Sequence, residues 1–152
     1  MQERKLMELA EAAGNIAIVG HVRPDGDCVG SCLAVCNYIT EQYPEKTVDV
    51  YLETPPAKFS YLKQFERICS DPDTGNQYDL CICLDSGDRE RLGKNVGYLN
   101  TAKTSICIDH HITNQGYAAA NFVKADASAT CEALYDFLDE EKISRDVAEC
   151  IY

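Results

Sequence analysis

Short apolar runs alternate along the chain with segments whose apolar residues repeat at helical spacing. Strands are predicted at residues 15–20, 46–53, 78–84 and 104–108, with a candidate edge strand at 119–123. Helices are predicted at residues 3–13, 29–41, 89–99 and 129–140, with one more opening at Ser144. Residues 57–77 are predicted to form a short helix followed by a loop.

The order of these elements indicates the fold class. Strands that alternate with helices predict an α/β fold, an open and largely parallel sheet with helices on both faces, Rossmann-like in architecture. Gly14 is a natural C-cap for the first helix, and either Asp126 or Ser128 is expected to cap the helix at 129–140. In such sheets the ligand site lies beyond the carboxyl ends of the strands. Three predicted strands run into His21, Asp85 and Asp109, so these side chains are expected at one edge of the sheet.

The histidines and their neighbours suggest a metal centre. All three histidines of the chain lie in two short loops, at residues 21–27 and 109–111, beside aspartates. Imidazole together with carboxylates suits a divalent ion of the Mn²⁺ type, whereas zinc would normally recruit cysteine. Aspartates that meet at one edge would repel each other unless cations neutralise them, which favours two metal ions over one.

Two metal ions a few ångströms apart imply a reaction class. Such a pair activates a water molecule and binds both the attacked and the departing oxygens of a phosphate, which is the chemistry of phosphoester hydrolysis. Pro24 and Gly26 help the loop to turn, so that Asp25 and Asp27 can point at different ions.

Composition narrows the choice of partners and compartment. The chain has 152 residues, 45% of them apolar, which predicts one globular domain. Fourteen basic against 25 acidic residues give a net charge of −11, so duplex DNA and other long polyanions are not expected as partners, while a short phosphorylated substrate is. No apolar run is long enough for a membrane span or a signal peptide, and a cytoplasmic protein without a membrane partner is expected.

Nine cysteines without a Cys-x-x-Cys pair are expected to be reduced thiols. Cys28, Cys32 and Cys36 lie on one helix face, where the choice is between a thiol metal stripe and packing on the sheet; packing is the preferred interpretation. A redox or dinucleotide-binding domain is disfavoured, because no Gly-x-Gly-x-x-Gly follows the first predicted strand.

Four motifs in order make the sequence resemble the DHH phosphoesterases. They are His21-Val-Arg-Pro-Asp-Gly-Asp-Cys-Val-Gly-Ser31, Cys83-Leu-Asp-Ser-Gly-Asp88, Ile108-Asp-His-His111 and Asp126-Ala-Ser-Ala-Thr-Cys-Glu132. Within the family the first motif is most similar to that of the bacterial bifunctional oligoribonucleases and pAp phosphatases. Cyclic-di-AMP phosphodiesterases carry similar motifs.

The resemblance implies a role for each motif residue. It implies two Mn²⁺ ions, the first held by His21, Asp25 and Asp85. The second would be held by Asp27, Asp85 and His110, with Asp85 bridging the two. His111 would contact the scissile phosphate, and Asp109 would orient the histidines. Ser128 and Thr130 are weaker candidates for binding the phosphate end of the substrate.

The resemblance also implies what the 152 residues do not include. Members usually supply one more aspartate to the second metal ion after the helix that opens near Ser144, and they carry a C-terminal substrate-binding domain. Residues 1–152 are therefore expected to be a DHH catalytic domain, incomplete at its C-terminus and without the C-terminal domain. A homodimer is a possible assembly.

The function expected from the resemblance is Mn²⁺-dependent hydrolysis of short oligoribonucleotides, of 3′-phosphoadenosine 5′-phosphate (pAp), or of both. The alternatives are a cyclic or linear dinucleotide phosphodiesterase, and an inactive module that binds metal or nucleotide.

Overall fold

The computed structural model describes residues 2–71 and 77–152, which form a six-stranded sheet in the order β3-β2-β1-β4-β5-β6. Every strand pair in it is parallel. The strands are β1 (Asn15–Val19), β2 (Thr47–Tyr51), β3 (Ile68–Cys69), β4 (Leu80–Leu84), β5 (Thr104–Asp109) and β6 (Ala120–Val123). The α-helices are α1 (Gln2–Ala12), α2 (Gly26–Gln42), α3 (Val96–Thr101), α4 (Thr130–Tyr135) and α5 (Arg145–Ile151). Short 3₁₀ turns lie at Ala57–Phe59, Phe65–Arg67, Glu90–Asn95 and Glu140–Lys142.

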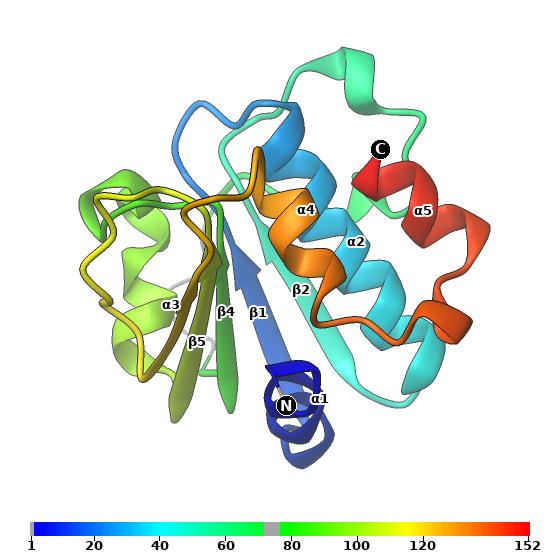
Figure 1. Ribbon diagram of the computed structural model, residues 1–152, viewed down its shortest axis with the longest axis horizontal. Coiled ribbons are helices and arrows are strands. Elements are labelled where there is room, and N and C mark those ends of the chain that lie inside the picture. The colour runs from blue at the N-terminus through cyan, green and yellow to red at the C-terminus, as the bar shows by residue number, and fades with distance from the viewer. Residues whose placement is uncertain (1, 72–76) are drawn as a thin grey trace.

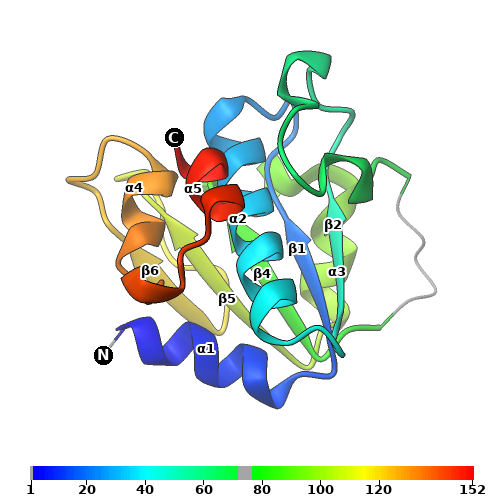
Figure 2. The same ribbon diagram turned by 90° about the vertical axis from the view of Figure 1, so that its right-hand side faces the viewer.

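Helices cover both faces of the sheet, as the sequence predicts (Figures 1 and 2). Helices α1, α2, α4 and α5 contribute to one apolar cluster, and α3 to the other. Strand β1 supplies both, because Ile16 and Ile18 point to the first cluster and Ala17 and Val19 to the second. This period-two alternation of buried residues is what makes the whole strand apolar.

Three local predictions differ from the structure. Strand β3 was not predicted, since two residues are too few to leave a periodic pattern. The predicted helix at 89–99 is a 3₁₀ turn followed by α3, because Gly93 adopts φ +59° and breaks the helical path. The predicted helix at 129–140 ends at Tyr135, where the chain tightens into i+3 turns that bury both Phe137 and Leu138.

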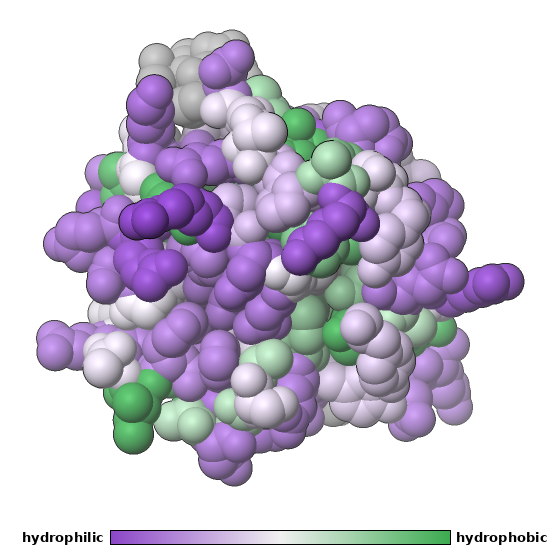
Figure 3. Space-filling view, turned by 90° about the horizontal axis from the view of Figure 1, so that it is seen from above, coloured by the Kyte–Doolittle hydropathy of each residue, from purple (hydrophilic) through white to green (hydrophobic). Residues whose placement is uncertain are grey.

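The carboxyl ends of the strands form the edge that matters for function. The segments that follow β1, β4 and β5 converge there with the first turns of α2 and α4, at the top of Figure 1. Figure 3 shows the molecule from this side, and hydrophilic residues gather over the middle of the face. Within the described residues, no helix has the length and apolar character that crossing a membrane requires.

Candidate metal centre

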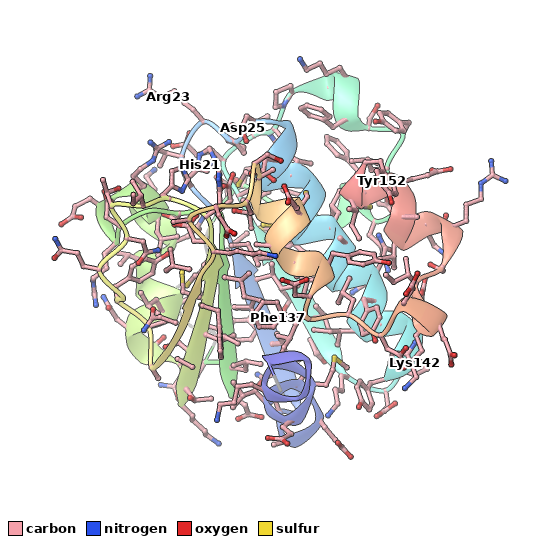
Figure 4. All side chains as sticks on the ribbon, in the orientation of Figure 1. His21, Arg23, Asp25, Phe137, Lys142 and Tyr152 are labelled. Atoms are coloured by element: carbon pink, nitrogen blue, oxygen red, sulfur yellow. The ribbon has the colours of Figure 1, made fainter. Side chains whose placement is uncertain are left out.

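The first donor group consists of His21, Asp25 and one oxygen of Asp85. His21 Nε2 lies 3.3 Å from Asp85 Oδ2 and 3.6 Å from Asp25 Oδ1. The other ring nitrogen, Nδ1, donates to the carbonyl of Val22 at 2.6 Å, which turns Nε2 toward the carboxylates. Figure 4 shows His21 and Asp25 close together above the sheet, while Arg23 between them in sequence points away from the molecule.

Asp25 reaches this position because it is also the N-cap of α2. Its Oδ1 accepts the backbone N–H of Cys28 at 3.0 Å, which satisfies one of the free donors in the first helical turn. The helix therefore begins at Gly26, three residues before the predicted start, and Asp27 lies in its first turn.

The second donor group consists of Asp27, His110 and the other oxygen of Asp85. His110 Nε2 lies 3.6 Å from Asp27 Oδ2 and 3.5 Å from Asp85 Oδ1. These three side chains come from α2, from the segment after β5 and from the end of β4. The structure thus brings together the five residues that the sequence nominated as metal ligands.

Asp85 joins the two donor groups. It follows β4 with φ +59°, a left-handed conformation that Asp tolerates better than most residues, and its N–H donates to Ile108 O at 3.2 Å. The residue is 2% exposed, and Thr130 Oγ1 donates to its Oδ1 at 2.9 Å. One carboxylate oxygen faces His21 and the other faces His110, so a single buried group spans both donor groups.

The first turn of α4 holds the second donor group in place. The backbone N–H groups of Thr130 and Cys131 donate to Asp27 Oδ2 and Oδ1 at 2.9 and 3.0 Å. The predicted caps of this helix, Asp126 and Ser128, do not cap it. The carboxylate that accepts its first N–H groups is that of Asp27 in α2, more than one hundred residues earlier. Ser128 instead donates through Oγ and N–H to Glu132.

His111 and Asp109 form a hydrogen-bonded pair, and their ligand atoms lie within 4.8 Å of those of Asp85 and His110. Asp109 ends β5 with no exposed surface, and its Oδ1 accepts a hydrogen bond from His111 Nδ1 at 2.6 Å. Its Oδ2 accepts from Asn114 Nδ2 at 2.9 Å. Asp109 therefore orients His111, whose side chain is 39% exposed, whereas no hydrogen bond joins it to His110 among the described contacts.

Burial and hydrogen bonds shift the acidity of this cluster in opposite directions. Burial raises the pKa of Asp85, and the contact with Asp85 raises the pKa of His21 to about 11. Burial alone would raise the pKa of Asp27 as well, but the N–H groups of Thr130 and Cys131 outweigh it and hold that pKa below its usual value.

Cys28 lies against the same cluster. Its thiol is fully buried, and hydrogen bonds with Cys32 and His21 lower its pKa to about 7. Cys32 and Cys36 are equally buried in the apolar cluster, as the packing interpretation predicts for these two residues.

Three groups of this site were not predicted in their present roles. Asn114 fixes Asp109, Thr130 holds two aspartates, and Cys28 adjoins His21 and Asp85. The pattern of apolar and polar residues in the sequence gave no signal for Asn114. In that pattern Cys28 could not be distinguished from the apolar residues that pack beside it on α2.

Comparison with known proteins identifies the family of the chain. The DHH family, N-terminal domain, matches residues 15–152. The chain is 31% identical over 151 residues to the probable bifunctional oligoribonuclease and PAP phosphatase NrnA of Streptococcus mutans, which covers 98% of this chain and 47% of that protein. It is 31% identical over 137 residues to the bifunctional oligoribonuclease and PAP phosphatase NrnA of Bacillus subtilis, covering 87% of this chain and 42% of that protein.

A solved structure, that of an exopolyphosphatase-related protein from Bacteroides fragilis, is similar with a TM-score of 0.87 and 25% identity. The match covers 99% of this chain and 48% of that chain. The chain thus spans about half the length of the relatives it matches. With its motifs on the strand ends and its family match over nearly the whole length, the chain belongs to the DHH family and represents the N-terminal domain of that family.

Proposed function

We propose that this chain is the metal-binding catalytic lobe of a phosphoesterase that takes two Mn²⁺ ions and acts on short oligoribonucleotides, on pAp, or on both. The observation that carries the proposal is the division of the Asp85 carboxylate between two donor groups. The names of the curated relatives support the substrate class, and the net charge of −11 favours substrates with few phosphates.

The residues fit a pair of divalent cations. Donor atoms that share one cation at 2.0 to 2.2 Å lie about 3 to 3.5 Å apart, and the four contacts between histidines and carboxylates measure 3.3 to 3.6 Å. The mixture of imidazole and carboxylate oxygen suits Mn²⁺. The first donor group would hold one ion and the second donor group the other, and the ions would supply an activated water and positive charge for phosphate oxygens.

The side chains around the two donor groups have their own tasks. Asp109 accepts a hydrogen bond from His111 Nδ1–H and so turns Nε2 of that ring away from Asp109; when the ring carries a second proton, Nε2–H would donate a hydrogen bond or that proton to a phosphate oxygen. Asn114 keeps the second oxygen of Asp109 occupied, so the ring is held in one orientation. Thr130 keeps Asp27 and Asp85 at a fixed separation, and Ser128, bound to Glu132, lies at the start of the same helix as a weaker contact for the phosphate end.

A second candidate function follows from the coverage. Since the chain spans about half of its relatives, a module that binds cations or nucleotide without turnover is the alternative, and a cyclic or linear dinucleotide phosphodiesterase is the alternative within the enzyme class.

A matched pair of substitutions tests the proposal. Asp85→Asn removes the charge shared by the two donor groups, and Asp88→Asn makes the same change at a carboxylate that accepts the Arg91 N–H and contacts neither group. The chain is titrated with Mn²⁺ by calorimetry and assayed for phosphate or nucleotide release from pAp, from a linear dinucleotide and from a longer oligoribonucleotide. We expect two bound ions and hydrolysis in the original chain and in Asp88→Asn, and neither in Asp85→Asn.

The other outcomes decide between the alternatives. Two bound ions without hydrolysis would favour the binding module. Hydrolysis of a dinucleotide, with neither pAp nor a longer oligoribonucleotide hydrolysed in the same assay, would favour the phosphodiesterase. Two ions retained by Asp85→Asn would refute the bridging role of Asp85.

A further inference from the structure

The first donor group has a sulfur neighbour that the proposed function does not use. Ligand atoms of His21, Cys28 and Asp85 all lie within 4.8 Å of one another. All three residues are buried, and among the described residues Cys28 is the only cysteine in such a group. Cys32, one turn further along α2 and equally buried, is outside it.

Local sequence explains why the thiol is there. Asp25 caps α2 through the N–H of Cys28, so the cap that places Asp25 beside His21 also places Cys28 in the first helical turn. Gly20 leaves the space for the sulfur, because a Cβ at that position would lie 2.4 Å from Cys28 Sγ. A methyl group there would force the thiol out of its place beside the end of β1.

We propose that Cys28 is a fourth ligand of the first donor group for thiophilic divalent cations, such as zinc, cobalt or cadmium. With His21, Asp25 and Asp85 it would complete a tetrahedral set, in which neighbouring donors lie about 3.3 to 3.8 Å apart around one ion. The donors of His21, Cys28 and Asp85, which lie within 4.8 Å of one another, reach that spacing by shifts of about 1 Å; Asp25 joins them through His21, whose Nε2 lies 3.6 Å from Asp25 Oδ1. The inference rests on the proposed function only in requiring a cation between His21 and Asp85.

The sulfur ligand changes the consequence of binding. Mn²⁺ prefers oxygen and nitrogen and has little use for the thiol, whereas a zinc-type ion would bind through it and release the thiol proton to the solvent. A zinc ion with four protein ligands keeps no open position, and open positions are what catalytic sites retain. Thiophilic cations are therefore expected to displace Mn²⁺ from the first donor group and to inhibit hydrolysis.

Cobalt absorption tests the proposal directly. Co²⁺ is added to the reduced chain in a phosphine reductant, and the near-ultraviolet sulfur-to-cobalt band is compared with the visible bands of bound cobalt. The original chain and Cys32→Ser should show both. Cys28→Ser and Cys28→Ala should lose the sulfur band but keep the visible bands from the remaining ligands, and should release fewer protons per chain on binding.

Each contrary result has a definite meaning. Visible bands without a sulfur band in the original chain would overturn this proposal while leaving the two-ion centre intact, as would a sulfur band that persists in Cys28→Ser. Failure to bind either Co²⁺ or Mn²⁺ would remove the proposed function as well. Should both Cys28 variants unfold, X-ray absorption of the zinc-loaded original chain decides, because a coordination shell without sulfur at about 2.3 Å overturns the proposal.

Discussion

Thr130 illustrates how much of this centre depends on single hydrogen bonds. Its backbone N–H binds Asp27 and its hydroxyl binds Asp85, so one fully buried residue fixes an aspartate of the second donor group and the carboxylate between the two. Residues that orient metal ligands affect metal affinity nearly as much as the ligands themselves.

Substitution of Thr130 separates the two bonds. Thr130→Val keeps the shape and the N–H but removes the hydroxyl donor, and we expect the affinity for Mn²⁺ to fall about 10- to 100-fold. Thr130→Ser keeps the hydroxyl and should bind within a few-fold of the original chain. Calorimetric titration measures both, and equal affinities for Val and Ser at this position would show that the hydroxyl has no part in holding Asp85.

At this scale the sequence predicted which side chains the structure brings together better than it predicted the hydrogen bonds that hold them there. His21 and Asp85 could be nominated because each follows an apolar strand, and parallel strands bring their carboxyl ends together. The bond between Thr130 and Asp27 joins residues 103 positions apart, and no local pattern encodes such a contact. The same holds for the approach of Cys28 to Asp85.

Among the described elements, α2 packs closely against α5 at Gly30. A Cβ at Gly30 would lie 2.4 Å from the carbonyl oxygen of Cys150, and backbone cannot move aside as a flexible side chain can. Asp25 caps α2 and Asp27 lies in its first turn. This contact with α5 therefore helps to set the position of both aspartates.

Two glycine-to-alanine substitutions test this packing. Gly30→Ala should lower the free energy of unfolding by roughly 1 to 3 kcal/mol through overpacking. Gly97→Ala is the matched control, since a Cβ there meets nothing within 4 Å inside α3 and should stabilise by about 0.5 to 1 kcal/mol. Urea unfolding followed by circular dichroism measures both, and a neutral Gly30→Ala would mean that α5 shifts without cost.

The elements themselves were largely predictable, because alternation of apolar strands and amphipathic helices specifies an α/β sheet with both faces covered. The predictions about the cap and the end of α4 were wrong because tertiary contacts decide both features. Asp27 replaces the expected cap, and burial of Phe137 and Leu138 ends that helix early.

Over the whole molecule, negative charge makes cation binding a matter of stability as well as chemistry. The chain carries a net charge of −11, and its aspartates converge at one edge of the sheet. A ligand that binds only the folded state stabilises it by mass action.

Divalent cations should therefore raise the melting temperature. Free Mn²⁺ at 100 times its dissociation constant adds about 2.7 kcal/mol per site, or roughly 5 to 10 °C for a chain of this length. Differential scanning calorimetry with Mn²⁺, and with sodium chloride at the same ionic strength, distinguishes binding from screening. An equal rise with both salts would show that only screening contributes.

The contact between α4 and Asp27 has a consequence for how the chain folds. The proposed ligands follow three different strands, and the bonds that hold them close loops of 45 and 103 residues, so no early, local intermediate can offer the complete proposed cation position. A cation should then leave the folding rate nearly unchanged and slow unfolding instead, since its contacts form after the rate-limiting step. Retention of the metal would thus mark those molecules that have finished folding.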